Sequence, residues 1–186
     1  MNQLEGKKVA ILATDGFEES ELIEPKKALD NADVKTEIVS LEKGEIKAWK
    51  NGNWSDSIAV DHEVSSVKHE DYDALLLPGG VMNPDKLRRD EDAVNFVRGF
   101  FKDHKPVAAI CHAPWMLIEA DVVKDREVTS FSSIRKDLEN AGAHWSDHEV
   151  IVDSGLITSR SPADLPVFNA KLVEEVWEGK HEEQTV

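Results

Sequence analysis

Short apolar runs alternate with helix-like segments along nearly the whole chain, and this alternation constrains the fold more than any other feature. Nearly continuous apolar runs, typical of strands buried on both faces of a parallel sheet, lie at 8–13, 73–77 and 107–110. Segments that read as helices follow them, at 18–31, 91–102 and 115–120. The pattern predicts an α/β fold in which helices sandwich a mainly parallel sheet.

The segments between these elements fit the same scheme. Residues 34–41 alternate apolar and polar side chains, which predicts another strand. Residues 42–62 are rich in glycine and asparagine and carry Trp49 and Trp54, which suggests a hairpin or an excursion of short strands that could line an interface or the cleft. Residues 149–152 and 156–159 predict a second hairpin.

The C-terminal third contains three further expected elements. Residues 128–131 predict a short strand, and Ser133 is expected to cap a helix that reaches Ala141. A last helix carries an apolar face from Leu165 to Val176. The 186 residues are expected to form one domain, 1–186, with its core at about 8–177 and a polar tail, 179–186, that frays.

Composition excludes several classes of function. The formal net charge of −15 repels phosphate backbones, so we expect no nucleic-acid partner. No stretch approaches 18 consecutive apolar residues, and the N-terminus lacks the apolar region of a signal peptide, so no membrane partner is expected. The single cysteine leaves no intramolecular disulfide framework and suits a reducing compartment. These features predict a cytoplasmic protein.

That cysteine, Cys111, lies between an expected strand and an expected helix. A side chain at such a junction projects from the strand end, and the backbone N–H groups at the helix start can receive an oxyanion. The helix dipole also favours a thiolate there. The alternative is that a lone cysteine is only a small buried hydrophobe.

Two other loops should meet this cysteine, because sites in parallel sheets form at the carboxyl ends of strands. The loop after the first strand supplies Glu18 and Glu21, one helical turn apart, and a protonated carboxyl beside a thiol favours the thiolate. The loop after residue 77 supplies Gly79 and Gly80, whose N–H groups can join an oxyanion hole. The alternatives are ordinary helix N-terminal charge and an ordinary turn.

His112 is the natural base for the thiol, although no acid in the local turn orients it. The other histidines lie in polar segments and read as surface residues. His144 and His148 have an i, i+4 spacing, but the helix pattern breaks near Gly142, so we expect no metal site.

Together these motifs resemble the PfpI family of the DJ-one superfamily, whose fold is flavodoxin-like, or class I glutamine-amidotransferase-like, with the cysteine at a nucleophile elbow. The resemblance covers about residues 8–176. It rests on four motifs: Phe17-Glu-x-x-Glu21-x-x-x-Pro25, Leu77-Pro-Gly-Gly80, Ala109-Ile-Cys-His112-x-Pro114 and Thr158-Ser-Arg-x-Pro-x-Asp-Leu165.

The resemblance implies roles for individual residues. Cys111 matches the nucleophile, His112 its neighbouring histidine, and Glu21 the glutamate that hydrogen-bonds the thiol. Glu18 matches an acid at the pocket mouth, and Gly80 and the His112 backbone match the oxyanion donors. An acid after the Pro-Gly-Gly loop, here Asp85, reaches the histidine of a neighbouring subunit in such proteins, which implies a homo-oligomer, most simply a dimer.

Two positions depart from the family pattern. Ala113 stands where relatives commonly have glycine, which would tighten the elbow. Phe131 stands where relatives have tyrosine or histidine near the pocket, so a polar pocket contact is expected to be missing. Both departures bear on the substrate more than on the fold.

Three activities follow from the resemblance, none of which needs a cofactor. The first is a stress-protection enzyme acting on small reactive aldehydes or their adducts, a glyoxalase or deglycase, through the Cys111 thiolate. The second is a cysteine peptidase whose Cys-His-Asp triad is completed across subunits. The third is a redox-sensing or chaperone-like protein in which Cys111 is oxidised.

Overall fold

Seven strands form the central sheet of the chain, which a computed structural model describes over residues 4–186. Their order is β11-β12-β8-β7-β1-β3-β6, and every neighbouring pair is parallel except β11–β12. The strands are β1 (Lys8–Leu12), β3 (Lys35–Ser40), β6 (His62–Glu63), β7 (Ala74–Leu77), β8 (Val107–Ile110), β11 (Val150–Asp153) and β12 (Leu156–Ser159). The expected mainly parallel sheet is confirmed; residues 1–3 of the expected domain lie outside the described residues.

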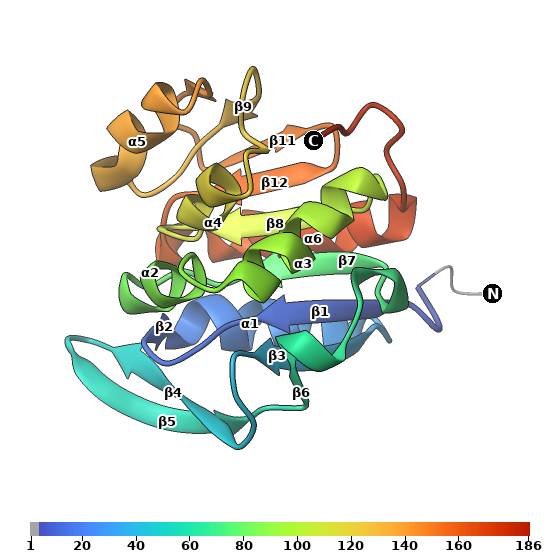
Figure 1. Cartoon of the computed structure of the whole chain (residues 1–186), viewed down its shortest axis with the longest axis vertical. Helices are drawn as coiled ribbons and strands as arrows, with labels where there is room; N and C mark the ends of the chain where they lie inside the picture. Colours follow the sequence, from blue (N-terminus) through green and yellow to red (C-terminus); the bar gives the residue numbers. More distant parts are fainter. Residues whose placement is uncertain (1–3) are drawn as a thin grey trace.

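Helices cover both faces of this sheet (Figure 1). Helices α1 (Glu19–Asn31) and α6 (Leu165–Glu178) pack side by side on one face, with Leu22, Leu29, Phe168 and Leu172 fully buried. On the other face lie α2 (Met82–Leu87), α3 (Glu91–Lys102), α4 (Pro114–Glu119) and, toward the β11 edge, α5 (Arg135–Asn140). Two apolar cores result, one on each side of the sheet, as the fully apolar strands require.

Residues 42–62 form the expected excursion. Strands β4 (Glu45–Lys50) and β5 (Asn53–Ala59) make an antiparallel hairpin, and β4 pairs with the short β2 (Phe17–Glu18). The hairpin projects beyond the edge of the central sheet that β3 and β6 form (Figure 1). Glu18 is the second residue of β2, so this pairing places the hairpin beside Glu18 and the start of α1.

The short connections contain single helical turns and one further strand pair. Strand β9 (Glu127–Val128) pairs in parallel with β10 (His144–Trp145). The strand expected at 128–131 ends at Val128, because the N–H of Thr129 donates to the side chain of Thr158 rather than to a strand. Four 3₁₀ turns lie at Val64–Ser66, His69–Asp71, Ser132–Ile134 and Pro162–Asp164.

The polar tail is ordered against the domain, so the expectation that it frays is wrong. The N–H of His181 donates to the carbonyl of His104, and the Arg126 guanidinium donates to the carbonyl of Thr185. Gln184 is fully buried. Hydrogen bonds to backbone carbonyls hold this segment, and they leave no apolar pattern by which a packed segment is recognised in a sequence.

The order of the strands sets the position of the site. Strands β8, β7 and β1 are neighbours in the sheet, so the loops at their carboxyl ends lie next to one another. These are the three loops that carry the cysteine, the paired glycines and the glutamates.

Candidate active site

Cys111 stands at a sharp turn between β8 and α4. Its φ of 64° is a left-handed conformation that non-glycine residues rarely adopt. Its N–H donates to the carbonyl of Ser159, and its own carbonyl accepts from the N–H of Phe131. Pro114 opens α4 directly after the turn. The backbone therefore holds the thiol at a strained elbow, the arrangement expected of a nucleophile.

The two glycines after β7 are required by close packing at this elbow. A Cβ on Gly79 would lie 2.3 Å from Oε2 of Glu21 and 2.7 Å from the Cβ of Cys111. A Cβ on Gly80, whose φ is 81°, would lie 2.4 Å from the carbonyl oxygen of Gly16. Only glycine allows the three loops to approach this closely.

Asn83 holds the glycine loop in place, a role that the sequence reasoning missed. Its amide nitrogen donates to the carbonyls of Pro78, at 2.9 Å, and Gly79, at 3.1 Å, and its amide oxygen accepts from the N–H of Thr14 at 2.8 Å. The side chain is fully buried. It ties the loop after β1 to the loop after β7, and its position after Pro-Gly-Gly was the only available signal.

Glu21 is fully buried, with its carboxyl group against Gly79. Burial, followed by the charge of Glu18, raises the pKa of Glu21 to about 8. Within residues 4–186 neither carboxyl oxygen has a partner in full hydrogen-bond geometry. The nearest groups that lower its pKa are the N–H of Gly79, the thiol of Cys111 and the N–H of Gly80. Glu21 is therefore mainly protonated at neutral pH.

The thiol of Cys111 responds to these same neighbours. Burial raises the pKa of Cys111, and the charge of an ionised Glu21 raises it further, whereas the N–H groups of Gly80 and His112 lower it. Because Glu21 keeps its proton below about pH 8, repulsion between the two groups is small at neutral pH. The N–H groups of Gly80 and His112 thus favour a negative charge on the sulfur.

His112 folds back over the thiol, with Nδ1 at 3.1 Å from Sγ of Cys111. Its other ring nitrogen, Nε2, lies 3.0 Å from Oγ of Ser133. Burial lowers the pKa of His112, which keeps the ring neutral. With the Nε2 proton donated to the Ser133 hydroxyl, Nδ1 presents its lone pair to the thiol and can accept the thiol proton.

Ser133 therefore has a different role from the one the sequence suggested. The expectation that it caps a helix is wrong: Ile134 precedes α5, and no side chain caps that helix. Instead, the hydroxyl faces His112, because the Ser132–Ile134 turn follows directly on the segment bonded to the elbow. No pattern along the chain shows this contact, which spans 21 residues.

Phe131 packs flat on the base. Its ring stacks on His112 with the centroids 4.8 Å apart and the planes 24° from parallel, and Trp115 contacts the same imidazole edge-on at 5.3 Å. Phe131 is nevertheless 39% exposed. Where a polar contact was expected to be missing, the aromatic ring fixes the orientation of the imidazole instead.

These residues line a cavity of about 390 Å³ around the thiol. Its walls are mainly apolar, and Trp49 from the hairpin and Pro162 from the loop after β12 contribute to them. Half-buried Glu18, whose pKa is raised by burial and by Glu19, stands in the wall. The lining residues are Gly16, Glu18, Glu21, Trp49, Gly80, Val81, Met82, Cys111, His112, Phe131 and Pro162.

Three of the expected site residues lie elsewhere. Gly79 lies behind the thiol and the Glu21 carboxyl rather than in the wall. Ala113 is buried behind the elbow, where its N–H donates to the carbonyl of Ile110. Asp85 is exposed on α2 and does not line the cavity, and the ring nitrogens of His112 meet Cys111 and Ser133 instead.

The Arg-x-Pro-x-Asp motif positions the cavity wall. The guanidinium and N–H of Arg160 donate to the buried carboxylate of Asp164, through contacts of 2.9 to 3.1 Å. This pairing holds the pKa of Asp164 low despite its burial. The turn that it closes presents Pro162 to the cavity.

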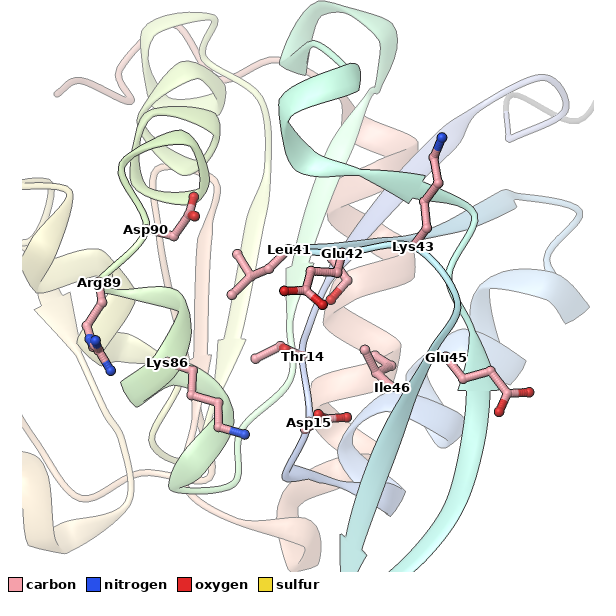
Figure 2. Close-up of a pocket in the computed structure, with 11 residues that line it drawn as sticks. Thr14, Asp15, Leu41, Glu42, Lys43, Glu45, Ile46, Lys86, Arg89 and Asp90 are labelled. Atoms are coloured by element: carbon pink, nitrogen blue, oxygen red, sulfur yellow. The ribbon is translucent and has the colours of Figure 1, made fainter.

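A larger cavity, of about 480 Å³, lies beyond Thr14, between α2 and the segment that joins β3 to β4 (Figure 2). Charged side chains of both signs line it, and Lys86 extends toward the side of Asp15. It contains neither a thiol nor a histidine. The smaller cavity, which is lined by the Cys111 thiol and the His112 imidazole, is the candidate active site.

A mainly parallel sheet flanked by helices, with a buried cysteine at a strand-to-helix turn, is the class I glutamine-amidotransferase-like fold. The sequence profile of the DJ-1/PfpI family matches residues 7–175. The chain belongs to the DJ-1/PfpI family, as its motifs predicted.

Known proteins similar to this chain carry different activities in their names. "Putative cysteine protease YraA" of Bacillus subtilis is 44% identical over 88% of this chain and 94% of that protein. "Protein/nucleic acid deglycase 2" of Escherichia coli is also 44% identical, over 88% and 94%. The crystal structure of Drosophila melanogaster DJ-1beta superposes with a TM-score of 0.84 and 27% identity, over 91% of this chain and 90% of that one.

Proposed function

We propose that this protein is a cytoplasmic stress-protection enzyme that acts on reactive carbonyl compounds, as a cofactor-free glyoxalase or deglycase. The observation that carries the proposal is the placement of the Cys111 thiol between a neutral base, His112 at 3.1 Å, and a protonated carboxyl, Glu21. The deglycase relative supports the same chemistry. No helix within residues 4–186 is long and apolar enough to cross a membrane.

The geometry supports a sequence of proton transfers. His112 Nδ1 takes the thiol proton, and the sulfur adds to the aldehyde carbon, forming a C–S bond and an alkoxide. The N–H groups of Gly80 and His112 stabilise the alkoxide until Glu21 or His112 protonates it, giving a hemithioacetal. Transfer of the aldehyde hydrogen, as a proton, to the adjacent carbonyl carbon gives a thioester, and water releases the acid and the free thiol. For methylglyoxal the product is lactate.

Peptide hydrolysis, the second candidate, is favoured by the relative named as a cysteine protease. It requires protonation of a departing amine by a histidine that a carboxylate orients. Here Nε2 of His112 meets the neutral hydroxyl of Ser133. A peptidase would therefore need Asp85 of a second chain in a homo-oligomer, whereas the glyoxalase reaction releases no amine and needs no such acid.

One experiment separates the two candidates. Wild type and Cys111→Ser are assayed side by side for lactate formed from methylglyoxal and for cleavage of a fluorogenic peptide. We expect lactate from wild type only, with peptide cleavage at background. Lactate formation by Cys111→Ser at the wild-type rate would contradict the thiolate mechanism, and thiol-dependent peptide cleavage alone would favour the peptidase.

The redox alternative rests on the same thiol. Because burial raises the pKa of Cys111, the resting group is mainly a thiol, which reacts with peroxide far more slowly than a thiolate. Mass spectrometry after mild peroxide treatment tests this alternative. Rapid and complete conversion of Cys111 to sulfinic acid would favour a sensor over an enzyme.

A further inference from the structure

A second cluster of chemically active side chains lies at the end of the sheet opposite to the one that holds Cys111. It forms where α6 ends and the chain turns back toward the amino ends of β8 and β12. The right-hand side of Figure 1 shows this turn, after which the tail runs toward β11 and β12. Its members are Glu175, Glu178 and His181, whose ligand atoms all lie within 4.8 Å of one another.

Glu175 and His181 come closest together. Oε2 of Glu175 lies 2.7 Å from Nε2 of His181, and Oε2 of Glu178 lies 3.9 Å from the same nitrogen. Glu175 is only 5% exposed, whereas Glu178 stands at the surface. The cluster thus joins one buried oxygen, one nitrogen and one oxygen open to solvent.

The short contact does not have the alignment of a hydrogen bond. Both Oε2 of Glu175 and Nε2 of His181 are buried atoms without a hydrogen-bond partner, although they are 2.7 Å apart. In a hydrogen bond the ring N–H points at the oxygen. Two ligands of one metal ion point at the ion instead and lie side by side. In a tetrahedral zinc site, N and O ligand atoms at about 2.0–2.1 Å from the ion are about 3.3 Å apart. The distances of 2.7 and 3.9 Å lie on either side of that value.

The backbone brings His181 to this position. Gly179, with a φ of 85°, reverses the chain after α6, and its N–H donates to the carbonyl of Glu175. The imidazole then packs on Gly155, where a Cβ would lie 2.8 Å from its Cδ2. Gln184 packs on the same glycine, fully buried, with neither atom of its amide bonded to another group within residues 4–186. Buried polar atoms are normally bonded to another group, and a bound ion is one partner that satisfies Oε2 of Glu175 and Nε2 of His181 together.

From this geometry we propose that Glu175, Glu178 and His181 bind a divalent transition-metal ion of the zinc type. One imidazole and two carboxylates suit zinc, whereas calcium and magnesium prefer oxygen ligands alone. Three protein ligands leave a fourth position for water or for a further oxygen. The ion links α6 to the tail, and the tail in turn contacts His104 and Arg126, so the metal fixes the C-terminal segment on the domain.

The test uses the full chain without a polyhistidine tag, in a Cys111→Ser background that removes the only thiol. The protein is stripped with EDTA and titrated with Zn²⁺ by calorimetry. We expect one ion per chain and a rise in the thermal midpoint with zinc. Glu178→Gln and His181→Gln should each weaken zinc binding by about tenfold or more and lose the rise in midpoint.

Glu174→Gln is the matched control. Glu174 directly precedes Glu175 in the same helix and is an exposed glutamate paired with Lys171. Its replacement removes one charge and should leave zinc binding unchanged. The proposal is overturned if the Cys111→Ser chain binds no zinc, because the cluster is then only an ion pair. It is also overturned if Glu178→Gln and His181→Gln bind zinc as tightly as the control. Glu178 stands at the surface, so its variant should fold normally.

Discussion

At Cys111, burial sets the protonation of the whole site. It raises the pKa of the thiol, raises the pKa of Glu21 to about 8 and lowers the pKa of His112. All three groups are therefore neutral near pH 7, and charge develops only when the thiol proton moves to the imidazole. The sequence predicted that these residues meet, since all of them lie at or just after strand ends, but it did not establish that Glu21 keeps its proton. It did not predict Ser133, which reaches the imidazole from another loop.

Glu21 should make the stability of the protein fall as pH rises from about 4.5 to about 8. In that window the unfolded chain loses the Glu21 proton and the folded chain keeps it, so rising pH favours unfolding. The slope from this one group is up to about 1.4 kcal/mol per pH unit. Denaturant unfolding of Glu21→Gln against wild type between pH 5 and pH 8 measures it. We expect a flatter profile for Glu21→Gln and a wild-type profile for the exposed control Glu24→Gln. Equal slopes in all three would contradict a buried, protonated Glu21.

Ser133→Ala should slow lactate formation by about tenfold, because the loss of one hydrogen bond, worth about 1–1.5 kcal/mol, leaves the His112 tautomer unfixed. The loss should appear in kcat rather than in KM, since the hydroxyl does not line the cavity. Ser132→Ala, one residue earlier on the same turn, is the control, and Ser133→Thr should restore most of the rate. A rate for Ser133→Ala equal to that of Ser132→Ala would remove Ser133 from the mechanism.

At the scale of the secondary-structure elements, continuous apolar runs in the sequence identified the buried strands that lead into the site. The helix at 91–102 and the strand at 107–110 have the predicted bounds, because a buried strand and an amphipathic helix leave periodic patterns in the sequence. The connections are less predictable, because polar side chains decide them through contacts distant in sequence. Thr158 ends a strand in this way, and Asn83 accepts a hydrogen bond from Thr14, which lies 69 residues earlier in the chain.

Replacing Asn83 should damage both stability and rate. Asn83→Ala removes three hydrogen bonds and leaves the carbonyls of Pro78 and Gly79 and the N–H of Thr14 buried without this partner. We expect a loss of roughly 2–4 kcal/mol in the free energy of unfolding. The rate should fall as well, because Gly80 is no longer held against the sulfur. Denaturant unfolding and lactate formation measure the two effects; a variant with the stability and rate of wild type would show that the glycine loop holds its own shape.

At the scale of the whole molecule, a single chain contains the proposed nucleophile, base and oxyanion donors but holds Asp85 away from them. The acid either serves a neighbouring subunit or has no part in the chemistry. The aldehyde mechanism needs only one chain, whereas the peptidase mechanism needs two. Measuring the oligomeric state alone therefore does not distinguish the two mechanisms. The distinction requires variants of Asp85 and of Cys111 in the same oligomer.

Mixing two variants provides that test. If Asp85 completes the site of a partner, Cys111→Ser and Asp85→Asn chains should each be inactive, and subunit exchange between them should restore part of the activity in mixed oligomers. For lactate formation we expect Asp85→Asn to retain the wild-type rate, because the acid does not line the cavity. An inactive Asp85→Asn chain that the Cys111→Ser chain rescues would contradict this expectation and establish a shared site.

The sequence by itself determined the α/β architecture, the family and the convergence of Cys111, His112, Glu21 and Gly80, because buried strands and loops at strand ends leave local signals. Only the tertiary structure decided which partners these residues meet. The contacts of Ser133 with the His112 imidazole, of Asn83 with the glycine loop and of His181 with Glu175 are all made by polar side chains. Such contacts depend on where the chain returns in space, and no periodicity along the sequence records that.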